Sequence, residues 1–238
     1  MNRKIVFMAL TVAVSAVFFF VFSLDKKEKA INAESDTKSA NQSKAEAVRF
    51  ADFETFTDDA KMAFLDDQKG KAAPPLLADL ALRAMSSPNL NVRKAAMAAI
   101  THLQSNDLLP VVRTALGDAS AEMRLLALHE ARLKTPVLRL NLLETAIRSD
   151  FADTRDAALV ELSRENPKAA VPIMMEGLNS PDAEFRARVW QEILPNIQAL
   201  RKMPFPNATE AIGWWNQVKG RFDDSMVLLD PSVPPSEN

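Results

Sequence analysis

Two histidines, His102 and His129, are the side chains best suited to bind a transition metal or to exchange protons near neutral pH. Glu130 follows His129, so an imidazole and a carboxylate could reach one metal ion there, whereas no acid follows His102. A single His-Glu pair supplies fewer ligands than a metal centre needs. We therefore interpret both histidines as ordinary surface residues, and a metalloenzyme that uses His102 and His129 is kept as an alternative.

The rest of the sequence lacks the motifs of common catalytic and cofactor sites. It has no cysteine, which excludes disulfides, thiol catalysis and thiolate metal ligands. It has five glycines and no glycine-rich phosphate loop or nucleophile motif. A net charge of −2 gives no basic face for nucleic acid. We predict a protein that is not an enzyme and that uses no cofactor, metal or nucleic acid.

An adjacent pair of tryptophans, Trp214 and Trp215, could stack on the rings of a sugar. Glu210 stands three residues after Asn207, the spacing of a capping box, so a helix is expected over residues 208–222. We predict that this helix covers the end of the fold. Cell-wall or other glycan binding through the two tryptophans is kept as an alternative.

A period of 31 residues organises the middle of the chain. Arginine recurs at this spacing four times, which we call the arginine column: Arg93, Arg124, Arg155 and Arg186. The position nine residues before each arginine is always small: Ala84, Ala115, Ala146 and Gly177. The position three residues after it is apolar: Ala96, Ala127, Ala158 and Val189. Several columns that agree at one period identify an internal repeat.

Each repeat is predicted to be a pair of antiparallel helices. In the third repeat, Thr135-Pro136 is a typical helix start, with an oxygen to cap free N–H groups and a proline suited to the first turn. Apolar residues follow at helical spacing, and a second helix is expected to begin at Asp153. One such hairpin cannot cover its own apolar stripe, so successive hairpins must stack.

The segments NVRKAAMAAITHL, AEMRLLALHEARL, DTRDAALVELSREN and AEFRARVWQEIL resemble HEAT repeats, and more closely the short bacterial HEAT-like, phycobilisome-lyase-like variety. The resemblance covers residues 73–200 and implies an all-α protein, an α-solenoid of about four 31-residue hairpins. It also implies a structural role for the arginine column, bonding to acidic groups of the same and adjacent turns. Some HEAT-like proteins are iron hydroxylases with several His-Glu pairs, and this chain has one. Such repeats serve many unrelated functions.

Before the repeats, residues 1–24 are predicted to be a transmembrane signal anchor, because residues 5–24 carry no charge and a helix of that length spans a bilayer. A cleaved signal peptide is the rival interpretation. Residues 25–47 are polar and predict a flexible linker. We expect a single-pass inner-membrane protein with its folded domain in the periplasm.

Atypical segments are expected to flank the repeats. Residues 48–72 predict an N-terminal cap helix, with Thr57 capping a helix that runs to about Gln68. Residues 201–222 predict a C-terminal cap helix. The proline-containing tail over residues 223–238 is predicted to be disordered.

The remaining candidate is a binding surface on the second helix of each hairpin, the helix that lines the concave side in HEAT-like solenoids. Positions one, five and eight or nine after the column arginine should face outward. These positions predict the partner-binding residues Lys94, Ala98, His102, Leu125, His129, Arg132, Val160, Arg164 and Gln191. We expect a membrane-tethered, non-enzymatic scaffold that holds a protein or peptide along this face.

Overall fold

The computed structural model describes residues 52–230. The predicted anchor (1–24), the linker (25–47), the first residues of the N-terminal segment and residues 231–238 lie outside the described residues. Within residues 52–230, no helix is both long enough and apolar enough to span a bilayer. The chain divides into two units, 1–55 and 56–238, and every α-helix described below belongs to the second.

The described residues form an all-α structure, without strands. A 3-10 helix, η1 (Asp52–Thr55), precedes α2 (Asp58–Gln68), which Thr57 caps by accepting a bond from the Ala60 N–H. Four helical hairpins follow, and then α11 (Ala208–Val218) and the 3-10 helix η4 (Lys219–Arg221). The hairpins are α3 (Pro74–Ala84) with α4 (Leu90–Ile100), α5 (Leu109–Leu116) with α6 (Ala121–Arg132), α7 (Pro136–Ile147) with α8 (Ala152–Leu162), and α9 (Pro167–Glu176) with α10 (Ala183–Ile197).

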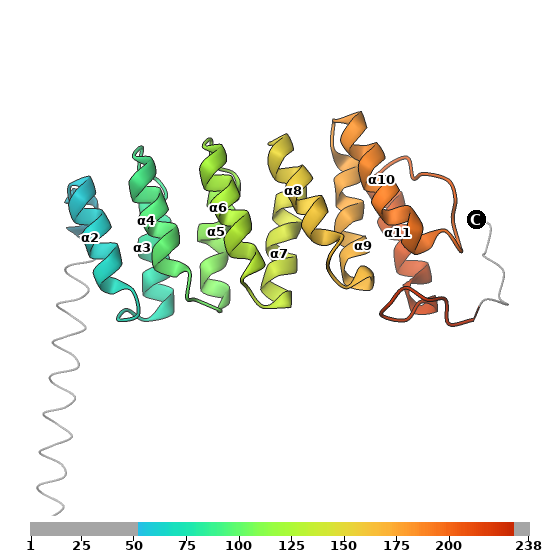
Figure 1. Cartoon of the computed structure of the whole chain (residues 1–238), viewed down its shortest axis with the longest axis horizontal. Coiled ribbons are helices and arrows are strands. Elements are labelled where there is room, and N and C mark those ends of the chain that lie inside the picture. Colours follow the sequence, from blue (N-terminus) through green and yellow to red (C-terminus); the bar gives the residue numbers. More distant parts are fainter. Residues whose placement is uncertain (1–51, 231–238) are drawn as a thin grey trace, which may run out of the picture. The chain divides into compact units, whose positions relative to one another are not determined.

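The helices follow the 31-residue period of the sequence. The second helices begin at residues 90, 121, 152 and 183, each 31 residues after the last. Among the first helices, α7 and α9 begin with a proline at residues 136 and 167, and the 3-10 helix η2 (Asn106–Leu108) occupies the equivalent position before α5. Figure 1 shows the hairpins side by side along residues 58–218, so one sequence period is one structural unit.

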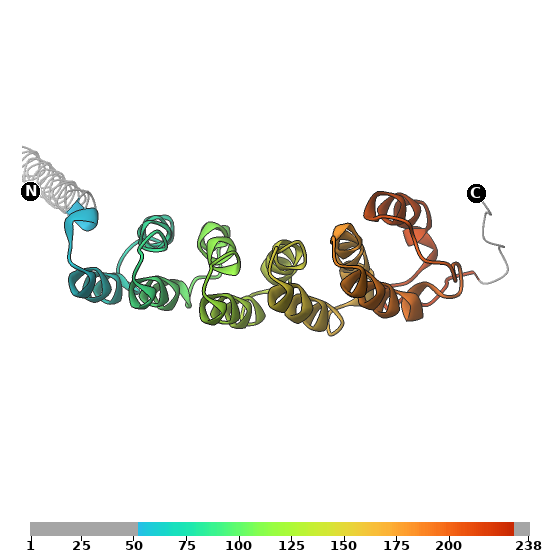
Figure 2. The same cartoon turned by 90° about the horizontal axis from the view of Figure 1, so that it is seen from above.

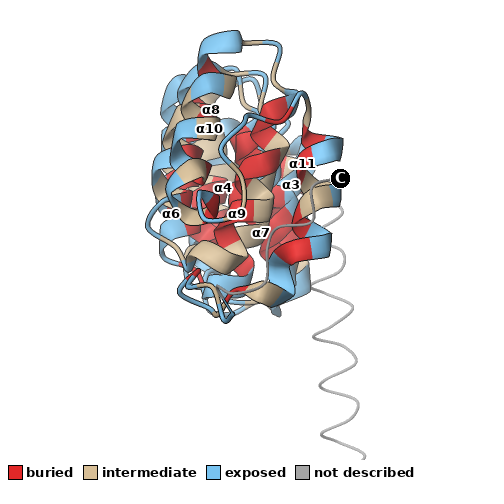
Figure 3. Ribbon diagram, turned by 90° about the vertical axis from the view of Figure 1, so that its right-hand side faces the viewer, coloured by how far each residue is buried: buried red, intermediate tan, exposed pale blue. Residues whose placement is uncertain are grey.

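Two layers of helices make up the row (Figure 2). Helices α2, α4, α6 and α8 pack in sequence to form one layer, and α3, α5, α7, α9 and α11 form the other. Figure 3 shows that the buried residues gather between the layers and that the exposed ones lie outside. Small residues at the helix contacts let the layers approach closely: Ala84, Ala115, Ala146, Ala96, Ala127 and Ala158 are all buried.

Helix starts agree in part with the sequence expectations. Pro136 and Pro167 each occupy the first turn of a helix, and the Asn166 side chain caps α9 by accepting from the Ala169 N–H. Thr135, in contrast, makes no side-chain capping bond, although an oxygen cap was expected there. Pro136 alone leaves one fewer N–H group to satisfy, because proline has none.

In the fourth hairpin, one repeat position has a smaller residue than in the other hairpins and a second position has a larger one. Gly177 replaces the alanine of the small column, and Val189 replaces the alanine three residues after the arginine. A Cβ atom on Gly177 would lie 2.9 Å from Cγ2 of Val189 and 3.2 Å from Cε1 of Phe185. The backbone of Gly177 has φ −63°, so the glycine is needed for space and not for conformation. The missing methyl group at residue 177 makes room for the extra carbons of Val189.

The C-terminal segment is more ordered than expected. Residues 223–238 were predicted to be disordered, but residues 223–230 form a hydrogen-bonded turn with an antiparallel bridge between Phe222 and Leu228. The Asp223 carboxylate accepts from the N–H groups of Ser225 and Val227 at 2.9 and 2.8 Å. Lys168 donates to the Phe222 carbonyl at 2.8 Å and thereby joins the turn to α9. The prediction rested on prolines, which all lie beyond the described turn or at its end.

We expect Gly177→Ala to lower the free energy of unfolding by about 1–2 kcal/mol, because overpacking outweighs the entropy gained by replacing glycine. Val189→Ala should cost stability in the wild-type chain and cost less, or nothing, in the Gly177→Ala background. A double-mutant cycle by urea denaturation, followed by circular dichroism, measures this coupling. Strictly additive effects would show that the two residues do not share this space.

Candidate functional site

The arginine column holds the turn inside each hairpin. In every repeat, Nη1 of the column arginine donates to the carbonyl oxygens five and six residues before it. For Arg124 these are the carbonyls of Ala119 and Asp118, at 3.0 and 2.8 Å. The same two bonds are present at Arg93, Arg155 and Arg186, at 2.7–3.1 Å. Sequence reasoning expected acidic partners and missed these carbonyls, which any residue type can supply.

The other edge of the guanidinium faces the next repeat. Nε and Nη2 of Arg93 bond to both oxygens of Asp118 at 2.8 and 3.2 Å, and those of Arg124 bond to Asp153 at 3.2 and 2.5 Å. Such paired bonds between guanidinium and carboxylate are strong and fix the geometry. Acids of the adjacent repeat therefore do contact the column, but they come from different repeat positions.

Asp153 is the acid whose ionisation the column affects most clearly. Its hydrogen bonds to Arg124, and further bonds from the N–H and hydroxyl of Thr154, hold the pKa of Asp153 below its ordinary value. The ring of Phe151 lies 3.8 Å from the Arg124 guanidinium carbon and covers its face. The joint between the second and third repeats thus combines an ion pair with a cation–π contact.

The predicted partner-binding residues lie on α4, α6, α8 and α10 or, for His102 and Arg164, directly after α4 and α8. We call this surface the even-helix face. Eight of the predicted residues are exposed, and Lys94 is half-buried in an ion pair with Glu122. The exposed members are Ala98, His102, Leu125, His129, Arg132, Val160, Arg164 and Gln191.

Charges on the even-helix face are largely matched between neighbouring helices. Arg132 of α6 bonds to Glu161 of α8 at 2.6 Å, and this bond raises the pKa of Arg132. Arg188 of α10 bonds to Asp156 of α8 at 2.6 Å. Arg164 also donates to Glu161 at 2.9 Å. The first two pairs tie adjacent hairpins together, and all three match charges that the face exposes.

Two apolar side chains on this face are unusually open to solvent. Leu125 of α6 is 59% exposed, and Val160 of α8 is 50% exposed. Their neighbours toward the other layer, such as Leu128 and Leu159, are buried as the helical spacing requires. Isolated exposed apolar residues are common in folded proteins. Here the two lie on adjacent helices of one face, which makes them the best candidates for a contact.

The His129-Glu130 pair does not form a metal site. Glu130 is buried, and its carboxylate lies 3.5 Å from Nζ of Lys134, whose side chain is completely buried. Lys134 also donates to the carbonyls of Thr101 and Leu103 at 2.6 and 3.1 Å. These contacts bind α6 to the C-terminal end of α4, whereas His129 is exposed. Within residues 52–230, no group of three or more histidine, aspartate or glutamate residues is placed to hold a metal ion.

Trp214 and Trp215 pack against different aromatic side chains of the protein and do not form an exposed pair. Trp215 is 3% exposed, and its ring stacks on Phe222 with centroids 6.0 Å apart. Trp214 packs on Phe205, which in turn meets Trp190 edge to face. The alternative of glycan binding through both tryptophans is therefore not supported at Trp215, whose ring is buried. Helix α11 packs against α9 and covers that end of its layer.

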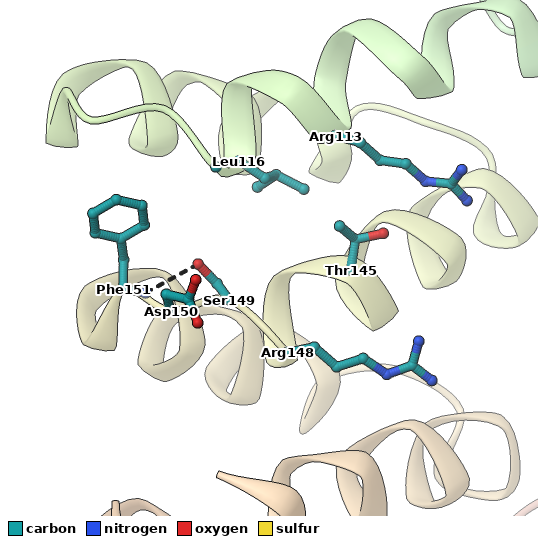
Figure 4. A pocket seen from close by; sticks show the side chains of 8 residues that line it. Arg113, Leu116, Thr145, Arg148, Ser149, Asp150 and Phe151 are labelled. Carbon is teal, nitrogen blue, oxygen red and sulfur yellow. Dashed lines mark hydrogen bonds between the residues drawn. The ribbon is translucent and has the colours of Figure 1, made fainter. Parts of the chain in front are cut away.

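Two hollows lie between successive hairpin turns, on the edge of the row. The first, of about 360 Å³, lies between α5 and the α7–α8 turn, and Figure 4 shows Arg113 and Arg148 extending beside it from the two helices. The second, of about 350 Å³, lies between the α7–α8 and α9–α10 turns. Arg148, Ser149 and Asp150 line both. The sequence does not predict these hollows, because their shape depends on how successive turns lie next to one another.

Comparison with known proteins gave no match to the chain, whether against family models, curated proteins or solved structures.

Protonation of Asp153 should contribute to acid unfolding. Since its pKa is lower in the folded state, its stabilising effect is present above the unfolded pKa of about 4 and is lost as the pH falls through the folded pKa. The Asp153 side chain is 45% exposed, so the effect should be below about 1 kcal/mol. Thermal unfolding of wild type and Asp153→Asn at pH 7 and pH 3 should show a smaller difference at pH 3. An unchanged difference would contradict this role.

Proposed function

We propose that the protein is a non-enzymatic scaffold whose repeats form a HEAT-like α-solenoid and whose even-helix face binds a protein or peptide partner. The spacing of the second helices supports the solenoid, since they begin at intervals of 31 residues and carry the same arginine–carbonyl bonds. Repeats of this kind gain stability from their neighbours and provide extended surfaces for binding.

The observation that carries the proposal is the composition of the even-helix face. Its charges are paired across adjacent helices, while Leu125 and Val160 remain exposed between them. A partner therefore need not separate strong unpaired charges from water, and it gains by covering the two apolar side chains.

The dimensions of the face favour an elongated partner. Packed helices lie about 8–10 Å apart, so four second helices present a stripe roughly 30–40 Å long. An α-helix of about 20 residues or a shorter extended segment has that length. We propose that the partner contributes one such segment, placed across α4, α6, α8 and α10.

We further propose that residues 5–24 anchor the protein as a single-pass inner-membrane protein and that residues 25–47 tether the repeats on the periplasmic side. The uncharged run of 20 residues and the polar segment after it support this arrangement. The tether would keep the even-helix face close to the membrane while allowing it to reorient.

Replacing both Leu125 and Val160 by aspartate should abolish partner binding without unfolding the protein, because both side chains are exposed. Partners can be identified by incorporating a photo-crosslinking residue at position 125 of the full chain in cells. The double variant should then lose the partner in affinity purification. The matched control is Val137→Asp with Val227→Asp, at side chains 78% and 60% exposed in α7 and in the C-terminal turn, neither of which belongs to a second helix. Equal loss in both variants, or loss in neither, would overturn the assignment of the face.

The proposed orientation predicts that alkaline phosphatase fused after Asn238 is active and that a fluorescent protein fused there is dark, because each reporter works on one side of the membrane. Activity per unit of fusion protein measures this directly. A control fusion without residues 5–24 should give the reverse result. A fluorescent full-length fusion would place the repeats in the cytoplasm and refute the periplasmic location.

A further inference from the structure

Arg155 differs from the preceding column arginines in its contact with the next repeat. The residue is 7% exposed, and its Nε has no hydrogen-bond partner. Its nearest acid is Asp182, at 3.6 Å from Nη2, which is too long for a hydrogen bond. A buried donor without a partner is costly, so this one calls for an explanation.

Asp182 does not close on Arg155 because it has another role. Its Oδ1 caps α10 by accepting from the N–H groups of Glu184 and Phe185 at 2.9 and 3.1 Å. These bonds also lower the pKa of Asp182, and its charge remains near Arg155 without binding it closely. Arg93 and Arg124, in contrast, each have a carboxylate on both Nε and Nη2.

The sequence period gives one position from which a carboxylate could come. Asp118, which pairs with Arg93, lies six residues before the next column arginine. The equivalent position after Arg155 is Ser180, one of the residues that line the second hollow, together with Arg155 itself. The serine side chain is shorter and uncharged, so the equivalent of Asp118 is absent where this hollow of about 350 Å³ lies.

We propose that the second hollow binds the carboxylate of an acidic side chain from a protein partner, at Nη2 of Arg155, since Nε of the same guanidinium is covered by the protein. Of the other charged residues that line the hollow, Arg148 and Glu176 pair at 3.3 Å, and Asp150 is exposed. Arg155 therefore combines a long ion pair, at 3.6 Å to Asp182, with a donor that has no hydrogen-bond partner. This site is on the turn edge and is independent of binding at the even-helix face.

The test titrates the full chain, in detergent and labelled with ¹⁵N-arginine, with a blocked aspartate (N-acetyl-aspartate methylamide). The expected result is a saturable shift of the Arg155 Nε–H signal, with half-saturation on the order of millimolar, as a single ion pair allows. Blocked asparagine and sodium chloride at the same ionic strength should leave this signal in place.

Ser180→Asp supplies the carboxylate from within the chain. In this variant the Arg155 signal should lie at the bound position without ligand, should no longer respond to blocked aspartate, and the melting temperature should rise. Ser87→Asp is the matched control, because it adds the same charge at the equivalent repeat position. Ser180 lies 25 residues after Arg155, whereas the residue 25 positions before Ser87 is Met62, which has no guanidinium group. This control should titrate like wild type. An equal shift with chloride, no shift with blocked aspartate, or an undiminished response in Ser180→Asp would each overturn the proposal.

Discussion

The bond between an arginine side chain and the backbone of its own turn is the interaction on which the repeat structure depends. Each hairpin must reverse direction between two helices, and carbonyl groups in the turn lie outside the hydrogen-bond ladders of both helices. A buried carbonyl left without a hydrogen bond costs on the order of 1–3 kcal/mol. Nη1 of the column arginine bonds to two carbonyls at once in all four repeats. The turn and the second helix therefore form one rigid unit.

The same guanidinium group also joins repeats, because its remaining edge faces the next turn. Lysine could not replace arginine here, since a single ammonium group cannot serve two carbonyls on one side and a carboxylate on the other in a fixed plane. The first and second joints use this second edge fully, through Asp118 and Asp153. The buried Lys134 adds a further connection at the first joint.

The sequence was sufficient to predict the helices because periodicity reports directly on which side chains face the core. The column three residues after the arginine, and the small column nine residues before it, are buried as their spacing implied. The N-cap at Asn207 also appears as expected: its side-chain oxygen accepts from the Glu210 N–H, and its side-chain amide donates to the Glu210 carboxylate. These features depend on nearest neighbours along one helix, which a sequence shows without a structure.

Several contacts that the sequence did not predict join residues 25–33 positions apart. Nothing in the local pattern says that Lys134 bonds to carbonyls of the preceding repeat, or that Asp153 rather than Glu122 meets a column arginine. The order of residues 223–230 was missed because it comes from Lys168 and from an aspartate that caps its own turn. For the exposed even-helix face, helical spacing gave the correct side of the helix, but it could not show how far the charges there are paired.

The unequal joints have a consequence for how the row deforms. In an array where each unit touches only its neighbours, the weakest contact determines where the array divides into separately opening segments. At the arginine column, the third joint has a 3.6 Å ion pair where the others have paired hydrogen bonds, and it depends more on the pairs Arg188–Asp156 and Arg148–Glu176 outside the column. If the column contact limits opening, bending should concentrate between the third and fourth hairpins, and the first three should move as a single block. The last hairpin and α11 then act as a hinged end piece, whose angle sets the curvature available to anything that lies across them.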